Sequence, residues 1–243
     1  MLDWKLLRLR EMLTARAMRI EVDGGREPSG ISQSEVSALL MMPTHAKQLL
    51  VLGHGAGAGM NHPFMEALAG ELAAVGMGTL RYQFPYMEHR RRVPDAPGLL
   101  LATVAAAVWT ARKVAPDVEL LAGGKSMGGR MTSQAAAEGL LEGVRGLVFF
   151  GFPLHPPGKV GTKRAEHLAK VRLPMLFLQG TRDTFADMKL LRGVCARVGS
   201  LATLHVLETA DHSFHVLKSA RKTNAEVLRE LAKTTEEWAA SIA

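Results

Sequence analysis

Short apolar runs alternate with amphipathic stretches along this chain, and that alternation is the feature that most restricts its fold. The runs that predict strands cover residues 18–23, 36–42, 48–53, 78–84, 118–124, 144–150, 174–180 and 202–208. Apolar residues at helical spacing lie between or after them, over 64–75, 100–111 and 227–242. From residue 48 onward this order predicts βαβ units with right-handed crossovers, and therefore a mainly parallel sheet. The inner runs are continuously apolar, as strands with helices on both faces should be.

The first two runs have no helical pattern between them and are joined by a stretch that contains Gly and Pro. We expect them to form an antiparallel hairpin at one edge of the sheet. No linker divides the chain, so we expect one α/β domain over residues 18–243 with a sheet of seven or eight strands. Before it, one helical stripe predicts a helical extension over 1–17, formed by Leu2, Leu6, Leu9, Leu13, Ala17 and Ile20. That extension could be a docking helix, a targeting segment, or translated from a start upstream of Met18.

Composition limits the setting in which such a domain would work. Cys195 is the only cysteine, so no intrachain disulfide can form, and we expect a cytoplasmic protein. The longest apolar run, residues 98–111, is shorter than the roughly 20 residues that a membrane span needs. Charged residues interrupt the N-terminus where a signal peptide would be apolar. The net charge of +7 is dispersed along the chain, so we expect no nucleic-acid partner.

The strongest chemical signal is the pentapeptide Gly124-Lys125-Ser126-Met127-Gly128, which lies between a predicted strand and a predicted helix. A G-x-S-x-G sequence in that context is typical of a nucleophile elbow, in which a sharp turn exposes the serine hydroxyl above the sheet. The Met127 amide would then point at a developing oxyanion. The same letters resemble the end of a phosphate-binding loop, but that motif needs a glycine where Glu119 stands, so the alternative fails.

A nucleophilic serine needs a base, and the base needs an acid that orients it. Asp183 follows the predicted strand 174–180, and His212 follows the next one. The order Ser126, Asp183, His212 is that of α/β hydrolases. Taken alone, the aspartate could be a turn residue and the histidine a surface residue. Asp187 and His215 are the second choices for acid and base.

A glycine-rich segment, residues 53–59, directly follows the strand 48–53 and could supply the second oxyanion donor. We assign that donor to the amide of Ala56, with Gly57 as the alternative. Residues 53–58 also match a dinucleotide-binding fingerprint, G-x-G-x-x-A. That interpretation requires an acidic residue at the end of the next strand, where Arg81 and Gln83 stand, and it leaves the serine, aspartate and histidine unexplained.

These stretches together resemble the α/β-hydrolase fold from about Met18 to the C-terminus, and within it the dienelactone-hydrolase-like branch. The chain is most similar to a small group that includes bacterial predicted hydrolases and a subunit of a eukaryotic chromatin-modifying complex. The sequences that carry this resemblance are GHGAGAGMNHPFM, RYQFPYMEHRRRVPD, GGKSMGGR, QGTRDTFAD and ADHSFHV. The resemblance implies a triad of Ser126, His212 and Asp183. Dienelactone hydrolases use a cysteine nucleophile, so the serine here argues against dienelactone as the substrate.

The same arrangement predicts the walls of the site. We expect substrate to contact Gly55, Gly57, Tyr86, Phe152 and Phe185, with the arginines of 90–92 near the entrance. Only residues 151–173 separate two predicted strands at the point where a lid domain would be inserted, so we expect none. Lys125 and Arg130 are expected to have structural or electrostatic roles.

The sequence therefore predicts a serine hydrolase acting on a small-molecule carboxylic ester or thioester, without cofactor or metal. The alternative from another class is a non-catalytic α/β-hydrolase-like interaction module, which the N-terminal stripe and the basic surface would suit. A dinucleotide-binding oxidoreductase is a minor alternative. The sequence leaves the oligomeric state open.

Overall fold

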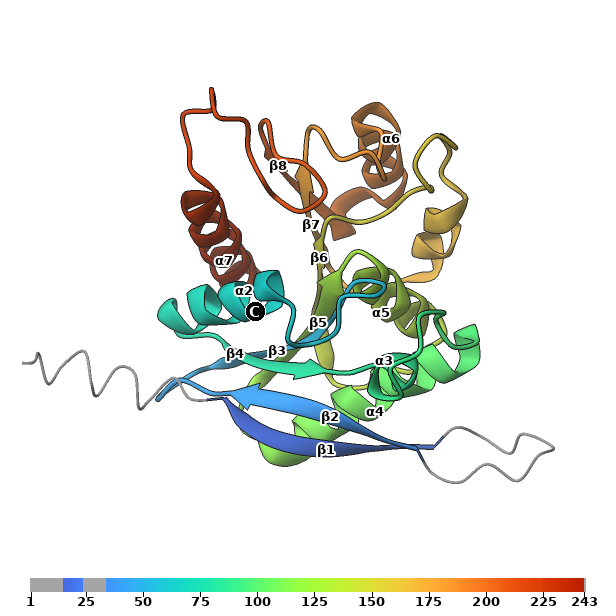
Figure 1. Cartoon of the computed structure of the whole chain (residues 1–243), viewed down its shortest axis with the longest axis vertical. Helices are drawn as coiled ribbons and strands as arrows, with labels where there is room; N and C mark the ends of the chain where they lie inside the picture. Colours follow the sequence, from blue (N-terminus) through green and yellow to red (C-terminus); the bar gives the residue numbers. More distant parts are fainter. Residues whose placement is uncertain (1–14, 24–33, 243) are drawn as a thin grey trace, which may run out of the picture.

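A computed structural model describes residues 15–23 and 34–242, and within them the predicted strand–helix alternation is confirmed (Figure 1). The strands are β1 (Arg16–Val22), β2 (Ser34–Met41), β3 (Gln48–Gly53), β4 (Gly78–Tyr82), β5 (Glu119–Lys125), β6 (Val144–Phe150), β7 (Met175–Gly180) and β8 (Ala202–Leu207). The helices are α2 (Pro63–Ala74), α3 (Pro85–Glu88), α4 (Pro97–Val114), α5 (Met127–Ala137), α6 (Met188–Val198), α7 (Asn224–Ser241) and the 3₁₀ helices η1 (Lys163–Lys170) and η2 (Gly199–Leu201). Each strand begins and ends within two residues of its predicted bounds.

The strands form one eight-stranded sheet in the order β1-β2-β4-β3-β5-β6-β7-β8. β2 is antiparallel to both of its neighbours, whereas the strands from β4 to β8 are parallel. The antiparallel edge hairpin expected from the first two runs is therefore confirmed. The chain leaves β3 for β4 on one side and later returns to β5 on the other side of β3. Such a reversal of strand order opens a crevice at the carboxyl ends of the strands.

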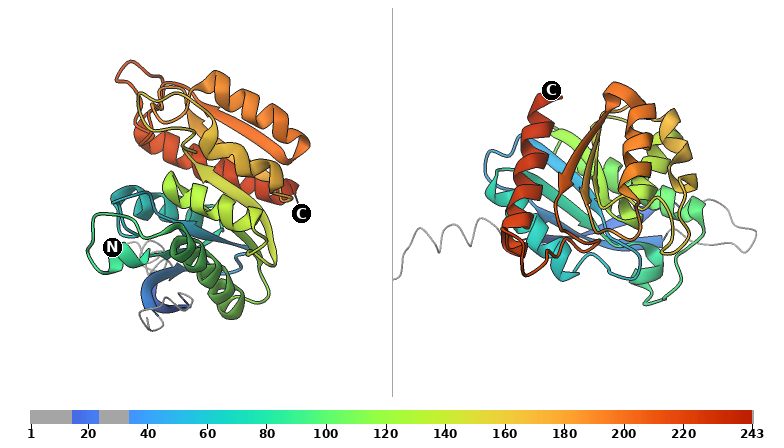
Figure 2. Two further views of the ribbon diagram at one scale, coloured as in Figure 1. Left: turned by 90° about the vertical axis from the view of Figure 1, so that its right-hand side faces the viewer. Right: turned by 90° about the horizontal axis from the view of Figure 1, so that it is seen from above.

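Helices cover both faces of the sheet because the central strands are apolar on both sides. In β3, Leu49 and Val51 pack into one buried cluster, and Leu50 and Leu52 pack into another. The first cluster is completed by α4, α5 and α6, and the second by α2 and α7. Figure 2 shows α6 (orange) and α7 (dark red) on opposite sides of the sheet. The loops after β3 and β5 consequently lead to helices on opposite faces.

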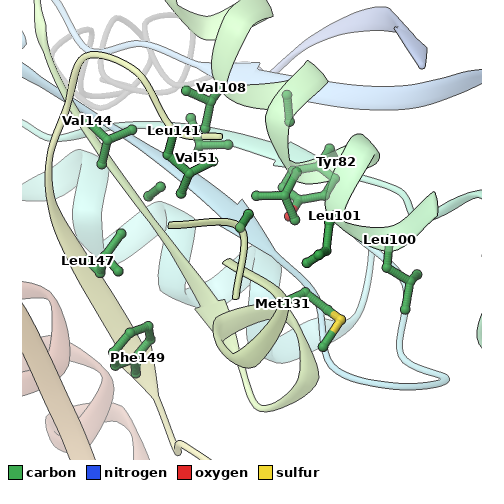
Figure 3. Close-up of a cluster of buried hydrophobic side chains, with 14 of the residues drawn as sticks. Val51, Tyr82, Leu100, Leu101, Val108, Met131, Leu141, Val144, Leu147 and Phe149 are labelled. Atoms are coloured by element: carbon green, nitrogen blue, oxygen red, sulfur yellow. The ribbon is translucent and has the colours of Figure 1, made fainter. Parts of the chain in front are cut away.

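The larger cluster is closely packed around aromatic side chains, and Figure 3 shows the part of it between α4, α5 and the sheet. Phe149 of β6 lies at one end of that view and is fully buried. Its ring centroid is 4.9 Å from that of Phe177 and 5.1 Å from that of Phe152. These contacts join β6, β7 and the loop after β6 directly beneath the carboxyl edge of the sheet.

The helical extension predicted over residues 1–17 falls largely outside the described residues, and it stays a prediction over 1–14. Of the residues in the stripe, Ala17 lies in β1 and not in a helix, and Ile20 lies in the same strand, as the run over 18–23 predicts. Ile20 pairs with Val36 of β2 and is fully buried. Tertiary pairing with β2 thus decides a segment whose local pattern also suits a helix. No helix in the described ranges is long and apolar enough to cross a membrane.

The aromatic contacts of Phe149 predict a large stability effect. Phe149→Ala should lower the free energy of unfolding by about 3–5 kcal/mol, because the cavity would lie inside a closely packed cluster. Urea denaturation would measure it. Trp109→Ala, at a side chain that is 55% exposed, is the control and should change stability by about 0.5 kcal/mol or less. A loss below about 1 kcal/mol for Phe149→Ala would contradict this packing.

Candidate active site

Ser126 lies in a sharp turn between β5 and α5, as the G-x-S-x-G sequence predicts. Its backbone has φ 51° and ψ −112°, in the left-handed region that non-glycine residues rarely occupy. The strain is held by two hydrogen bonds: the Ser126 N–H donates to the Phe150 carbonyl (3.1 Å), and the Ser126 carbonyl accepts from the Arg130 N–H (3.1 Å). The turn therefore exposes the side chain at the carboxyl edge of the sheet.

The glycines on either side of Ser126 are required by close packing. A Cβ on Gly124 would lie 2.4 Å from the carbonyl oxygen of Gly53, and a Cβ on Gly128 would lie 2.2 Å from the same oxygen. No side chain fits at either position without moving the backbone. The end of β3 thus approaches the β5–α5 turn closely enough to bring the glycine-rich segment after β3 beside Ser126.

Three side chains at three strand ends are joined by hydrogen bonds. The Ser126 Oγ is 2.9 Å from His212 Nε2, and His212 Nδ1 is 2.6 Å from Asp183 Oδ2. Because an ionised carboxylate can only accept, Nδ1 carries the proton, and Nε2 is left to accept from the serine hydroxyl. The geometry therefore joins the three residues that sequence order singled out, in the arrangement of a nucleophile, a base and an orienting acid.

Asp183 is held in place by further donors. Its side chain is fully buried, its Oδ2 accepts from Gln179 Nε2 (2.6 Å), and its Oδ1 accepts from the Phe185 N–H (2.7 Å). The Phe185 ring also packs against the imidazole of His212, with ring centroids 4.3 Å apart and the two planes tilted by 32°. Both the carboxylate and the imidazole are thereby fixed before any substrate binds.

The second choices for acid and base have other partners. The Asp187 carboxylate accepts from the Leu190 N–H (2.9 Å) and caps the N-terminus of α6. The side chain of His215 is 66% exposed, and its backbone N–H donates to the Asp211 carboxylate (2.9 Å). Neither side chain is hydrogen-bonded to Ser126 or His212.

A second serine–histidine pair connects α5 to η1. Ser133 Oγ is 2.7 Å from His167 Nε2 and 2.8 Å from the Arg130 carbonyl. The carbonyl can only accept, so the hydroxyl donates to it and receives the proton of His167 Nε2. Burial and the nearby Arg130 lower the pKa of His167 to about 4. His167 therefore donates its proton to a fully buried serine hydroxyl, whereas a general base would accept the proton of that hydroxyl.

The glycine-rich segment after β3 is shaped by a buried histidine. His54 Nε2 accepts from the Phe84 N–H (3.2 Å), so its Nδ1–H donates to the Gly55 carbonyl (2.7 Å). Burial lowers the pKa of His54 to about 4, which keeps the ring neutral at physiological pH. In a trans peptide the C=O and N–H point in opposite directions. Fixing the Gly55 carbonyl against His54 therefore directs the Ala56 N–H away from that ring.

A hydrogen bond to Tyr86 distinguishes Ala56 from Gly57 as the second oxyanion donor. The Gly57 N–H donates to the hydroxyl of Tyr86 (3.0 Å) and is already paired. Further along, the Met60 N–H donates to Gln83 Oε1 (2.8 Å), so the segment after β4 holds the segment after β3 at several points. The structure thus leaves the Ala56 N–H as the better candidate.

A pocket of about 260 Å³ opens above Ser126. The residues that line it are Gly55, Ala56, Ala58, His62, Phe64, Met65, Lys125, Ser126, Phe185, His212 and Ser213. Of the predicted substrate contacts, Gly55 and Phe185 are among them. A larger hollow of about 410 Å³ beside α4 is lined by Trp109 and Leu140 among others and contains no serine or histidine.

Three predicted substrate contacts, Gly57, Tyr86 and Phe152, do not line the pocket. Gly57 is exposed, whereas the other two side chains are buried. Tyr86 is fully buried, and its hydroxyl is occupied by the Gly57 amide. Phe152 is 1% exposed, packs in the aromatic cluster below the site, and donates its N–H to Gln179 Oε1 (2.9 Å). Sequence reasoning missed Phe64 and Met65, which line the pocket from the first turn of α2. Their only sequence signal is that α2 follows the glycine-rich segment directly.

The segment between β6 and β7 adds no lid. Within it, η1 packs against α5 and α6 at the side of the sheet, and the structure contains no lid domain among its described residues. The pocket above Ser126 therefore stays open at the carboxyl edge.

Comparison with known proteins agrees with this geometry. A model of the alpha/beta hydrolase domain matches residues 46–240. The chain belongs to the alpha/beta hydrolase family. The predicted resemblance to the α/β-hydrolase fold is thereby confirmed. Family membership leaves the dinucleotide-binding interpretation of residues 53–58 without support.

Several solved structures share the fold of this hydrolase-family chain. An α/β serine hydrolase without lid from Xanthomonas campestris aligns with a TM-score of 0.70 at 18% identity, covering 93% of this chain and 95% of that one. A dienelactone hydrolase from Anabaena variabilis aligns with a TM-score of 0.68 at 20% identity, covering 93% and 97%. An esterase domain from Rhodothermus marinus aligns with a TM-score of 0.68 at 14% identity, covering 93% and 98%.

The two histidines with lowered pKa values predict a loss of stability in acid. Between the folded-state pKa of about 4 and the ordinary value of 6.5, the unfolded chain binds more protons, so the free energy of unfolding falls as pH falls through that window. His167→Gln removes one of the two imidazoles that bind a proton on unfolding, while its side-chain amide can still donate to Ser133. The free energy of unfolding of this variant should fall less steeply with falling pH than that of the unaltered protein. The difference between the two slopes should be up to about 1.4 kcal/mol per pH unit.

Urea denaturation between about pH 7 and pH 5 would measure the slope. His89→Gln, at an exposed histidine, is the matched control and should keep the slope of the unaltered protein. Equal slopes for His167→Gln and the unaltered protein would mean that His167 is not held neutral.

Proposed function

We propose that this protein is a serine hydrolase that cleaves small carboxylic esters or thioesters through an acyl-enzyme. The observation that carries the proposal is the chain of hydrogen bonds from Ser126 through His212 to Asp183, with the serine at the floor of an open pocket. The same constellation of nucleophile, base and orienting acid performs acyl transfer on unrelated folds, so both the geometry and the family support these roles.

Each group has a defined part in the reaction. His212 Nε2 takes the hydroxyl proton as Ser126 Oγ attacks the carbonyl carbon, and Asp183 stabilises the imidazolium that forms. The carbonyl oxygen becomes an oxyanion that accepts from the backbone N–H groups of Met127 and Ala56. When the tetrahedral intermediate collapses, the imidazolium gives its proton to the departing alcohol or thiol. Water, deprotonated by His212, then attacks the acyl-enzyme and releases the acid with regeneration of Ser126.

The size of the pocket favours small substrates. A volume of about 260 Å³ is at the low end for ligand pockets and admits a short acyl group beside Phe64 and Phe185. Over residues 15–23 and 34–242 the structure has no lid that would enclose a long aliphatic chain. Short-chain and aryl esters are therefore the substrates to test first.

The proposal predicts that an active-site fluorophosphonate labels Ser126 stoichiometrically, because only an activated hydroxyl attacks phosphorus at a useful rate. Intact-mass and peptide mass spectrometry would locate the adduct. Ser126→Ala should be folded and unlabelled, with ester turnover at background. Ser133→Ala is the matched control, since it removes the serine of the other Ser–His pair, and it should label normally. Folded protein that stays unlabelled would favour the interaction-module alternative instead.

A second prediction concerns the orientation of the Ala56 amide. His54→Leu removes the donor to the Gly55 carbonyl, so we expect kcat for a short ester to fall by about 10- to 100-fold, somewhat less than for outright loss of a donor. Tyr86→Phe removes the partner of the Gly57 amide and is the control, with an expected loss of less than about fivefold. Circular dichroism would confirm that both variants fold. An unchanged kcat in folded His54→Leu would argue against Ala56 as an oxyanion donor.

A further inference from the structure

Lys125, the residue immediately before the nucleophile, has a buried ammonium group that the reaction described above does not use. The residue is 9% exposed, and its Nζ has no hydrogen-bond partner. Lysine is rarely buried to this degree unless it is paired. It stands at the end of β5, on the face of the sheet that α2 covers.

Aromatic rings form the nearest surroundings of this group. Lys125 Nζ lies 5.4 Å from the ring centroid of Phe214 and 5.9 Å from that of Phe64. The two rings are themselves stacked, with centroids 5.6 Å apart. Cation–π attraction offsets part of the cost of burying the ammonium. Desolvation still lowers the pKa of Lys125 to about 8, against the opposing effect of the Asp183 and Asp211 carboxylates.

The ammonium also lies beside the hydrogen bond between Asp183 and His212. A Cβ built on Gly151, just after β6, would be 3.1 Å from Lys125 Nζ and 3.4 Å from both Asp183 Oδ2 and His212 Nδ1. The ammonium, the carboxylate and the imidazole therefore all surround the same point beside Gly151. Lys125 is among the residues that line the pocket, but its Nζ is enclosed, so the ammonium is placed to act on the reaction through its neighbours.

A buried, unpaired charge is costly when an apolar side chain of the same length would fill the space. Methionine would pack against Phe64 and Phe214 without any desolvation penalty. Retaining a lysine next to the nucleophile thus lowers stability at neutral pH. Such losses of stability are characteristic of functional sites, where a residue needed for the reaction replaces one that would pack better.

We propose that Lys125 is a positioning residue whose ammonium charge acts on the Asp183–His212 pair and extends toward lower pH the range in which His212 is neutral and can accept the Ser126 proton. The inference rests on the proposed function. A cation at this distance disfavours the imidazolium and stabilises the Asp183 carboxylate. With an effective dielectric constant between those of protein and water, the effect on the acidic limb of the pH profile is about one pH unit.

Other ionisable groups lie around the Asp183–His212 pair, and none of them is substituted in the test. Asp183 favours the imidazolium from the end of β7, and Asp211 does so from the loop that carries His212. His215 is paired with Asp211 at 3.9 Å, and His62 lines the pocket from the start of α2. A substitution of Lys125 alone leaves these groups in place, so a shift of the profile reports the lysine charge.

The experiment compares the unaltered protein, Lys125→Met and Lys113→Met by two readouts. The first is the pH dependence of the rate of fluorophosphonate labelling. The second is the pH at which the NMR signal of the His212 Nδ1–H titrates, assigned by its absence in His212→Ala. Lys125→Met should move the acidic limb and the NMR transition upward by about one pH unit. Lys113, which lies over the exposed Trp109 ring at 3.5 Å, should move neither.

If the acidic limb and the NMR transition fall at the same pH in Lys125→Met as in the unaltered protein, the proposal is overturned. If Ser126 is not labelled at any pH, the proposed function fails, and the NMR transition still decides the role of Lys125. A measurement on the unaltered protein covers the case in which the variant does not fold. The Lys125 ¹³Cε signal should titrate near pH 8, and the His212 Nδ1–H signal should show a step at the same pH. Absence of that step would overturn the proposal as well.

Discussion

The close approach of β3 to the turn between β5 and α5 is the constraint on which the rest of the site depends. It is possible only because Gly124 and Gly128 present no side chain toward the carbonyl of Gly53. At this point the strand order reverses, and the two loops diverge to helices on opposite faces. The reversal opens the crevice, and the absence of side chains at its base lets two backbone segments meet there. Ser126 and the Ala56 amide are neighbours for that reason.

Three hydrogen-bonded histidines support this arrangement, and each has a different task. His54 orients a peptide, His167 ties η1 to α5, and His212 bridges Asp183 and Ser126. Burial lowers the pKa values of the first two, and their hydrogen bonds define which ring nitrogen carries the proton. The comparison of Ser126 with Ser133 shows why a short serine–histidine distance is not sufficient evidence for catalysis. The direction of the proton in the hydrogen bond decides the role.

Much of the fold and part of the site could be predicted from local patterns. The inner strand runs are short and apolar on both faces, so their positions followed from the local sequence pattern. The nucleophile, acid and base all lie where a strand ends. Tyr86 and Phe152 show where this reasoning stops. Both follow strands, as the catalytic candidates do, yet one turns inward to pair with Gly57 and the other packs beneath the sheet. Position after a strand gives no information about which way a side chain turns.

The sequence by itself determined the order and type of the elements, the single α/β domain, and the three chemical groups at three strand ends. These are properties of local periodicity, turn residues and chain order, which need no knowledge of distant neighbours. Tertiary structure alone decided that β1 takes in Ala17, that Gly57 is already paired, and that Phe64 and Met65 line the pocket. It also placed the Lys125 ammonium beside Asp183 and His212. Those outcomes depend on contacts between segments far apart in the chain, where packing and burial override local pattern.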